Sequence, residues 1–411
     1  MNVTLLPPGH PSWNTEIERL GIRLHAGENP TLFPYHFLSV VLQRIGGYLA
    51  SFSRDEREVG AGFLFPRWDA GGPAYTLRYH QLHPDGDILP ATLTTLTAQS
   101  LHHAKIVYYD PTAPQQYSAT GEEFGAVNIG RPTQAEAEEI RVIQQEVWGS
   151  PPESLYPVDI HSDQFAMATS LVARVEGKLA GFLFGVNKFG GPPLPGDWDV
   201  RFNGSQRIES QTMGVLPGYR GMRIGFLLKK NQAALAWKQG IGVINWTVDP
   251  LQFPNAALNL GLLRGLAYNF YPDLYPFRNE LNRVAASRFA ITWIVGSKHV
   301  RDVPLFGSKA LILDLSKQRN VAFINRGWTD VDYSVNNAVV AIEIPNNWTA
   351  LQQNALDQAL AWREVTDRIF SHYLGAAPGK YVLTGVGVKG ERRYLIGERV
   401  NEEIWQHLGR Y

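Results

Sequence analysis

The chain of 411 residues contains no cysteine, which excludes disulfide bonds, thiolate nucleophiles and cysteine metal sites. Neither sign of charge is in excess, because 38 Lys and Arg stand against 38 Asp and Glu. This balance favours neither nucleic acid nor an anionic membrane surface as a partner. The histidines fit no spacing that is typical of zinc ligands, so we expect no metal site.

Long apolar runs are missing as well. No stretch reaches the roughly 18 apolar residues that a membrane-spanning helix needs. The N-terminal residues MNVTLLPPGHPSW lack the basic region and the apolar core of a signal peptide. We therefore expect a cytoplasmic protein with no membrane partner. The 44% of hydrophobic residues suffices for well-packed cores, and the length favours two to three domains.

The most informative stretch runs from Ile208 to Asn245 and is typical of a strand, a loop, a helix and a second strand. Residues 208–215 alternate as in a half-buried strand, and apolar residues recur at helical spacing over 224–237. The loop between them holds Pro217, Gly218, Gly221 and Gly225. A glycine-rich turn that leads directly into a helix presents unpaired N–H groups at the positive end of the helix dipole. This loop therefore predicts a phosphate site.

The same loop resembles motif A of the GNAT superfamily of acyl-CoA-dependent N-acyltransferases, V-x-P-x-x-(Q/R)-x-x-G-x-(G/A). The motif is matched at Val215, Pro217, Arg220 and Gly225. Arg223 stands where the family has its middle glycine, and an arginine there could itself contact phosphate. A simple helix cap is the alternative interpretation of so short a motif. The segments VLPGYRG, WTVDPL, NAALNL and NFY resemble a poorly characterised bacterial branch of predicted GNAT acetyltransferases, over about residues 127–400.

The resemblance implies a GNAT fold, which is a mixed, mostly antiparallel central sheet flanked by helices (α+β or α/β), and acetyl-CoA as the acyl donor. It implies that backbone groups of Met213 and Val215 pair with the pantetheine arm. The pyrophosphate would bind N–H groups of the loop, and Asn255 near the start of the next helix would complete the donor site. The loop residues so implied are Arg220, Gly221, Met222, Arg223, Ile224 and Gly225. Lys229 or Lys230 could reach the outer phosphates, or could simply be solvated.

Glu209 is the first candidate for acid–base chemistry. It lies on the strand where many GNAT proteins have a catalytic Glu, and a partly desolvated cleft can raise the pKa of a carboxyl group toward neutrality. The alternative is an ion pair with Arg207, Arg174 or another cation. Asp249, at the end of the following strand, is the reserve candidate, although Asp-Pro also suits a strand terminator.

The tyrosine that serves as general acid in the family is missing, because its position falls on Gly261. Tyr268 and Tyr271 lie just beyond and are candidates to replace it. Aromatic residues at such positions more often pack in a core, so this alternative stays open.

The order strand, turn, helix, strand occurs twice, ending once in YYDP and once in TVDP, which suggests an internal duplication. The first copy has His83-Pro84-Asp85-Gly86-Asp87 where the second has its glycine loop, and negative charge there disfavours phosphate. We therefore predict tandem copies: a degenerate GNAT-like domain over residues 1–120 and a GNAT acyltransferase domain over 126–411. The first copy could wall the cleft of the second, and a homodimer is a further arrangement that the sequence allows.

Smaller elements are also predicted. Residues 38–50 and 58–65 are predicted as a strand pair, although the apolar stripe of the first segment is ambiguous. Residues 349–374 are predicted as one long amphipathic helix, and residues 380–388 with 393–397 as a closing hairpin.

These features predict an enzyme that transfers an acetyl group from acetyl-CoA to the amine of a small molecule or amino acid, by direct attack in a ternary complex. Succinyl-CoA or another acyl donor would fit the same loop. The alternative is a degenerate module that binds CoA or another nucleotide without turnover, which Gly261 and Arg223 favour and the otherwise intact motif opposes. The acceptor is not predicted, because acceptor pockets in such folds are built from variable loops.

Overall fold

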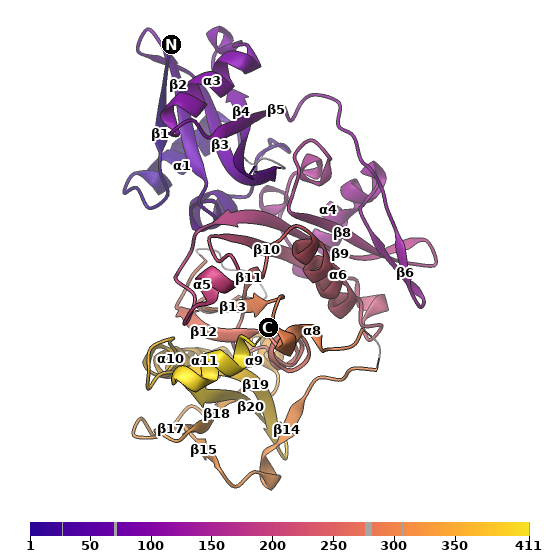
Figure 1. The fold of residues 1–411 in the computed structure, drawn as a ribbon, viewed down its shortest axis with the longest axis vertical. Coiled ribbons are helices and arrows are strands. Elements are labelled where there is room, and N and C mark those ends of the chain that lie inside the picture. The colour runs from indigo at the N-terminus through magenta and orange to yellow at the C-terminus, as the bar shows by residue number, and fades with distance from the viewer. Residues whose placement is uncertain (27, 70–71, 276–281, 306, 411) are drawn as a thin grey trace. The chain divides into compact units, whose positions relative to one another are not determined.

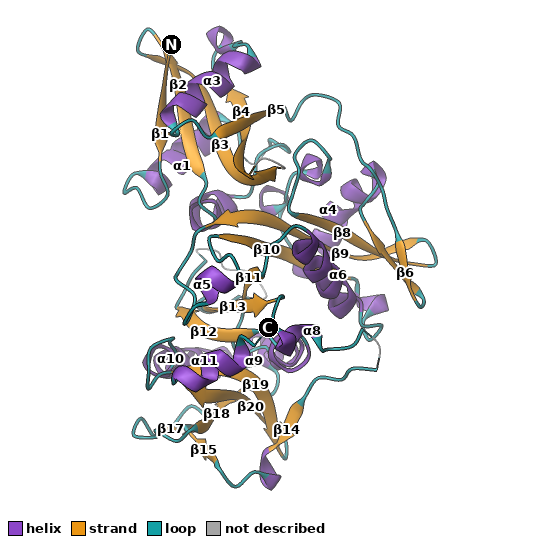
Figure 2. Cartoon of the chain, viewed as in Figure 1, coloured by secondary structure: helices purple, strands orange, loops and turns teal. Residues whose placement is uncertain are grey.

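The structure is a computed structural model that describes residues 1–26, 28–69, 72–275, 282–305 and 307–410. The chain forms two compact units (Figure 1). Unit 1 consists of Met1–Pro192 and Ser205–Leu235, and unit 2 of Pro193–Gly204 and Ala236–Tyr411. Figure 2 shows that both units combine strands with helices.

The first part of unit 1 is a five-stranded sheet in the order β1-β2-β3-β4-β5. Neighbouring strands are antiparallel except β4 and β5, which are parallel over Ala74–Arg78 and Lys105–Tyr109. The elements are β1 (Asn2–Leu6), α1 (Trp13–Arg23), a π-helical turn (Phe37–Val41), α2 (Leu42–Arg44), β2 (Tyr48–Arg54), β3 (Arg57–Asp69), β4 (Gly72–Gln81), a 3₁₀ turn (Pro84–Gly86), α3 (Pro90–Ser100) and β5 (Lys105–Tyr109).

The second part of unit 1 is built on strands in the order β6-β7-β8-β9-β10, all antiparallel to their neighbours. The elements are β6 (Glu122–Phe124), β7 (Val127–Gly130), α4 (Gln134–Trp148), 3₁₀ turns (Pro152–Ser154 and Val158–His161), β8 (Thr169–Val175), β9 (Lys178–Phe189), β10 (Gln206–Val215), a 3₁₀ turn (Pro217–Tyr219) and α6 (Ile224–Lys238).

Two helices cover the two faces of these strands. One face of β9 carries Leu183, which packs with Leu227 and Leu228 of α6 in a single apolar cluster. The neighbouring residue Phe182 points to the other face, as alternation in a strand requires, and its ring meets Trp148 of α4 edge to face. A capping box of Thr133 and Glu136 fixes the start of α4.

The two parts of unit 1 share an order of elements. From β1 to α3 and from β7 to α6, each runs through a strand, a helix, three antiparallel strands, a 3₁₀ turn and a helix, with short helices between some of them. The first part then ends with β5, whereas β11, the strand after α6, belongs to unit 2. The boundary between the compact units differs from the boundary between the predicted domains 1–120 and 126–411. Unit 1 contains the first copy together with the strands β6 to β10. The domain division therefore stays a proposal.

Unit 2 contains strands in the order β11-β13-β12-β19-β20-β18-β15, with β14 beside β19 and a separate pair β16-β17. Its elements are α5 (Trp198–Arg201), β11 (Val243–Val248), α7 (Phe253–Ala256), a π-helical turn (Ala257–Leu262), β12 (Leu266–Tyr271), β13 (Arg288–Ile294), α8 (Lys298–Arg301), β14 (Ile312–Asp314), a 3₁₀ turn (Leu315–Lys317), β15 (Val321–Phe323), β16 (Asn325–Arg326), β17 (Asp330–Val331), β18 (Val339–Ile344), α9 (Trp348–Asn354), α10 (Leu356–Tyr373), β19 (Tyr381–Lys389), β20 (Arg392–Arg399) and α11 (Glu402–Leu408).

The mixed, mostly antiparallel sheets flanked by helices confirm the predicted architecture. The closing hairpin is confirmed as β19 and β20, which turn at Gly390. Two predictions are wrong. Residues 38–50 are mainly helical before β2 begins, and the long helix is two helices that meet at Ala355. Among the described residues, no helix has the length and apolar character needed to cross a bilayer.

Candidate functional site

The loop between β10 and α6 has the backbone of an anion site. A 3₁₀ turn over Pro217–Tyr219 leads to Gly221 at φ 88° and Arg223 at φ 62°, and α6 begins at the next residue. Two N–H groups bond within the turn, from Arg220 to Pro217 and from Met222 to Tyr219. Within the described part of the chain, no acceptor bonds the N–H groups of Gly221, Arg223, Ile224 or Gly225. These groups lie at the positive end of a 15-residue helix, where an anion binds favourably.

Arg223 adopts a left-handed backbone at the position where the motif has its middle glycine. Only glycine, and to a lesser extent Asn and Asp, adopts this conformation at low cost. The backbone at this position is therefore of the kind that favours glycine, although the residue is an arginine. The Arg223 guanidinium lies 4.8 Å from the ring centroid of Phe226, and Arg220 is exposed. Both cations thus belong to the loop that would face an anion.

The corresponding helix of the first copy, α3, offers no such site. Pro90 occupies its first position and has no N–H, and the Leu89 carbonyl accepts from Thr92 and Leu93. In the preceding turn the His83 ring accepts from the N–H of Asp85. The two copies therefore differ at this helix start as expected. They differ in the backbone N–H groups that are left unbonded as well as in the charge of the preceding turn.

The end of β10 directs two backbone N–H groups to the side away from β9. The N–H of Leu216 donates to the Ala180 carbonyl at the end of β9. Because backbone groups alternate along a strand, the N–H groups of Met213 and Val215 point away from β9. A β-bulge between Ser210 and Thr212 leaves Gln211 unpaired with β9. The bulge thus lies two residues before the first backbone group implied in pantetheine binding.

Glu209 forms the ion pair that was the alternative to a base role. Its side chain is buried and lies 2.7 Å from Arg44 Nη2 and 3.1 Å from Lys188 Nζ. Burial alone would raise the pKa of Glu209, but the charges of Arg44 and Lys188 outweigh burial, and the pKa lies below its ordinary value. The expected rise in pKa is therefore wrong, and so are Arg207 and Arg174 as partners. Arg44 comes from the first copy, which composition and spacing could not reveal.

Lys229 is not placed to reach a phosphate. It is buried under β10, where its Nζ donates to Ser210 Oγ at 2.7 Å, and burial lowers its pKa well below the ordinary value. Lys230 is partly buried, which lowers its pKa as well. The interpretation of Lys229 as a solvated lysine is therefore wrong, whereas that of Lys230 stays open.

The remaining candidates lie in unit 2. Asn255 is exposed on α7, near the start of the helix as the motif implies. Tyr268 on β12 is buried, accepts from Thr292 Oγ1 at 3.3 Å and packs against Trp405 at 5.5 Å between ring centroids. Tyr268 is therefore a core residue, which is the alternative that the sequence left open. Tyr271 ends β12 and is partly exposed.

Asp249 is held as a structural carboxylate in unit 2. Arg363 Nη2 donates to both of its oxygens at 3.0 and 2.8 Å, and Trp348 Nε1 donates to one of them at 3.1 Å. The role of reserve base finds no support in this arrangement.

A hydrogen-bonded group that no sequence pattern predicted lies beside the bulge of β10. Gln211 Nε2 donates to Tyr156 Oη at 2.8 Å, and His36 Nε2 lies 3.2 Å from the same oxygen. These residues are 55 and 120 positions apart from Tyr156 and belong to no common motif. Only the pairing of the two copies brings them together.

No family model matches the sequence, and no curated protein matches it. Among solved structures, the chain is similar to Naa50 of Arabidopsis thaliana, in complex with a bisubstrate analogue (14% identity, 41% of this chain and 98% of that chain, TM-score 0.31). It is also similar to yncA of Salmonella typhimurium, a putative acetyltransferase with acetyl-CoA (13%, 42% and 95%, 0.30). A third is the diaminobutyrate acetyltransferase EctA of Paenibacillus lautus (16%, 41% and 95%, 0.30). At such identities and TM-scores this likeness assigns no activity to the chain.

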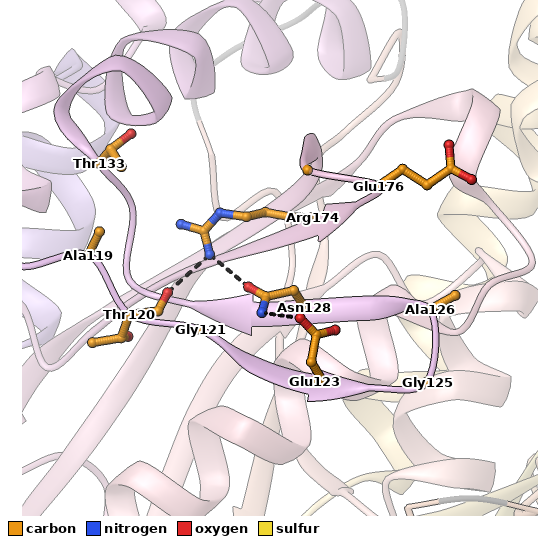
Figure 3. Close-up of a pocket in the computed structure, with 11 residues that line it drawn as sticks. Ala119, Thr120, Gly121, Glu123, Gly125, Ala126, Asn128, Thr133, Arg174 and Glu176 are labelled. Carbon is orange, nitrogen blue, oxygen red and sulfur yellow. Dashed lines mark hydrogen bonds between the residues drawn. The ribbon is translucent and has the colours of Figure 1, made fainter.

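A surface hollow of about 670 Å³ lies beside β6, β7 and β8 (Figure 3). Its main polar group is Arg174, which donates to the Thr120 carbonyl at 3.1 Å and to Asn128 Oδ1 at 3.0 Å. The same guanidinium also pairs with Glu136 and donates to the Arg131 carbonyl. All three of its nitrogens have partners, so the hollow is a structural junction. Among the described residues, no group of three His, Asp or Glu could hold a metal ion.

Proposed function

We propose that the chain is an acyl-CoA-dependent N-acyltransferase whose donor site lies at the start of α6. The observation that carries this proposal is the loop of Arg220 to Gly225, with two left-handed residues and four N–H groups that no described acceptor bonds. A diphosphate is an anion of the right size for several adjacent N–H donors, and the helix dipole adds to the attraction. Arg220 and Arg223 supply positive charge beside it.

The pantetheine arm would continue from this loop along β10. The N–H groups of Met213 and Val215 point to the side away from β9, where the arm would pair with them as an added strand does. The Val215 N–H would then polarise the thioester carbonyl. Asn255 is the proposed contact from α7. The reaction needs no covalent enzyme intermediate, since the amine attacks the bound thioester directly.

The proposed donor is acetyl-CoA, with succinyl-CoA and other acyl-CoA molecules as alternatives that the same loop would hold. The proposed acceptor is the amine of a small molecule or amino acid. Two of the similar structures named above bear the names of acetyltransferases, and one of these is named for diaminobutyrate. A homodimer and a cytoplasmic location remain proposals.

A second function is a module that binds CoA without turnover. Two observations favour it. Glu209 is locked between Arg44 and Lys188, and Gly261 supplies no hydroxyl where the family has its general acid. Both functions use the same donor loop, so thiol release from bound acetyl-CoA separates them.

The substitution Gly225→Asp tests the donor site. An acidic residue in the first turn favours a helix, so we expect α6 to stay folded, while the carboxylate repels the diphosphate. We expect calorimetry to show at least a tenfold loss of acetyl-CoA affinity relative to the unmodified chain.

The matched control is Thr92→Asp, which places the same charge in the first turn of α3, an exposed position of the first copy. We expect it to bind acetyl-CoA like the unmodified chain. Equal binding by Gly225→Asp and Thr92→Asp would contradict the placement of the donor at α6.

A further inference from the structure

A hollow of about 600 Å³ is lined by residues of unit 2 alone. Its walls come from the end of β18, the segment that leads into α9, the helix α10 and the turn that joins β19 to β20 (Figure 1). The charged residues that line it are Glu343, Lys389, Glu391 and Arg392. The hollow therefore presents both signs of charge without an excess of either.

Glu343 is the buried charge of this hollow. It belongs to the apolar strand β18 and is 7% exposed. Its Oε2 accepts from the Gly327 N–H at 3.1 Å and from Arg392 Nη1 at 3.3 Å. Within the described residues, Oε1 has no hydrogen-bond partner. A buried carboxylate is stable only when donors surround it, so Oε1 is the atom that a cationic group in the hollow would bond.

Trp362 of α10 gives the hollow an aromatic wall. The residue is 6% exposed, and its ring packs against Trp328 at 5.5 Å between ring centroids. An indole ring attracts an ammonium group and also covers apolar side chains. The ring and the Glu343 carboxylate line the same hollow, so together they suit an amine that carries an apolar group.

The two cations of the hollow have capacity for an anion. The Arg392 side chain is 55% exposed, and its bonds to Glu343 and Tyr394 use only part of its five N–H donors. Lys389 is exposed, with its Nζ 4.7 Å from the ring centroid of Phe323. A carboxylate beside Glu343 would therefore meet positive charge. An α-amino acid carries its ammonium and carboxylate groups on one carbon atom, which suits the short separation of Glu343 and Arg392.

We propose that this hollow binds an α-amino acid with an apolar side chain in its zwitterionic form. The ammonium group donates to Glu343 Oε1, the carboxylate accepts from Arg392, and the apolar side chain packs on Trp362. Like charges oppose simpler ligands, because a lone anion would lie beside Glu343 and Glu391 and a lone cation beside Lys389 and Arg392. This inference is independent of the proposed function, since it uses no residue of the donor loop.

The test is calorimetry on the full chain with L-leucine as the probe. We expect submillimolar binding. Leucinamide lacks the carboxylate and N-acetylleucine lacks the ammonium group. We expect each to bind about tenfold more weakly or worse, which is the usual effect of losing a hydrogen bond between charged groups.

Glu343→Gln tests the ammonium contact. We expect a loss of L-leucine affinity of about tenfold or more, because the neutral amide replaces the carboxylate. The amide oxygen can still accept from the Gly327 N–H, so we expect the chain to stay folded. Arg392→Gln tests the carboxylate contact at a half-exposed position, and it keeps the proposal testable if Glu343→Gln does not fold. The matched control is Glu364→Gln, which removes an exposed carboxylate of α10 and should bind L-leucine like the unmodified chain.

Absence of L-leucine binding at millimolar concentration by the folded chain would overturn this site. Equal affinity for leucinamide or N-acetylleucine would contradict recognition of a zwitterion. Binding of L-leucine that survives both Glu343→Gln and Arg392→Gln would mean that the amino acid binds elsewhere, and would also overturn the site. We expect Glu343→Gln to bind acetyl-CoA like the unmodified chain. Failure of the unmodified chain to bind acetyl-CoA would overturn the proposed function and leave this site standing.

Discussion

At the scale of single residues, Arg223 is notable because an arginine occupies a left-handed backbone position where the motif has glycine. A non-glycine residue in the left-handed region costs roughly 1–2 kcal/mol. At φ 62° Arg223 bears that cost at the start of α6, with its guanidinium over the Phe226 ring. If the loop binds an anion, the positive charge of Arg223 stabilises the bound anion. This stabilisation would offset the backbone strain and links it to the proposed function.

We expect Arg223→Gly to lower the affinity for acetyl-CoA about five- to tenfold, because one cation beside the diphosphate is lost. Glycine adopts the same backbone without strain, so α6 should keep its start and the melting temperature should change by only a few degrees. Calorimetry and thermal unfolding measure the two effects. Arg264→Gly, a change at the same backbone angle elsewhere, is the control. Unchanged or tighter binding by Arg223→Gly would mean that the loop acts through its backbone alone.

Glu209 shows the limit of an argument from position on a strand. The strand was predicted correctly, but the cations that surround Glu209 come from residues 21 and 165 positions away. Their charges decide its pKa more than its burial does, and they turn a candidate base into a buried ion pair.

Glu209→Gln should therefore act on stability first. Removing one partner of a buried ion pair typically costs about 3–5 kcal/mol, because Arg44 and Lys188 are left without their carboxylate. Urea unfolding at pH 7.5 measures this loss, with the exposed Glu139→Gln as the control. Since the folded pKa is depressed, the contribution of Glu209 is present above its ordinary pKa and is lost as the pH falls through the folded value. Full stability with a large loss of kcat would instead restore the base role.

At the scale of elements, the sequence predicted helices and strands best where local signals agree. The helix α4 shows such signals, since Thr133 and Glu136 form a capping box and Gly149 ends the helix at φ 62°. The start of α6 was predicted from the glycine loop. Residues 38–50 were misassigned because a buried helical turn and a strand have the same apolar composition, and only tertiary packing distinguishes them.

The donor loop of the candidate site was predictable because all its parts are contiguous in sequence. The hydrogen-bonded group beside the bulge of β10 was not. Tyr156, His36 and Gln211 come from three distant segments, and tertiary packing brings them together. No periodicity or spacing in the sequence encodes such a contact.

At the scale of the whole molecule, the first copy is part of the same compact unit as the strands that carry the donor loop. Its helix α3 begins with Pro90 instead of a glycine loop, and it supplies Arg44 to Glu209 and His36 to Tyr156.

Buried histidines should make the folded chain sensitive to mild acid. Burial lowers the pKa of His80 and His161 to about 3 and that of His36 to about 4. Below pH 6.5 the unfolded chain takes up protons that the folded chain does not, so the free energy of unfolding falls, by up to about 1.4 kcal/mol per pH unit for each histidine. Urea unfolding between pH 7.5 and 5.5 should show this loss. His80→Phe should reduce the slope, whereas the exposed His372→Gln should not; equal slopes in all three would contradict the account.

The central claim is that one of two copies carries a working donor site, and the stoichiometry of acetyl-CoA binding tests it most directly. Calorimetry on the unmodified chain should give micromolar binding of one acetyl-CoA per chain, because α6 starts with four N–H groups that no described acceptor bonds, whereas α3 starts with Pro90 after an acidic turn. Two molecules per chain would contradict the asymmetry between the copies, and no binding by a folded chain would contradict the proposed function.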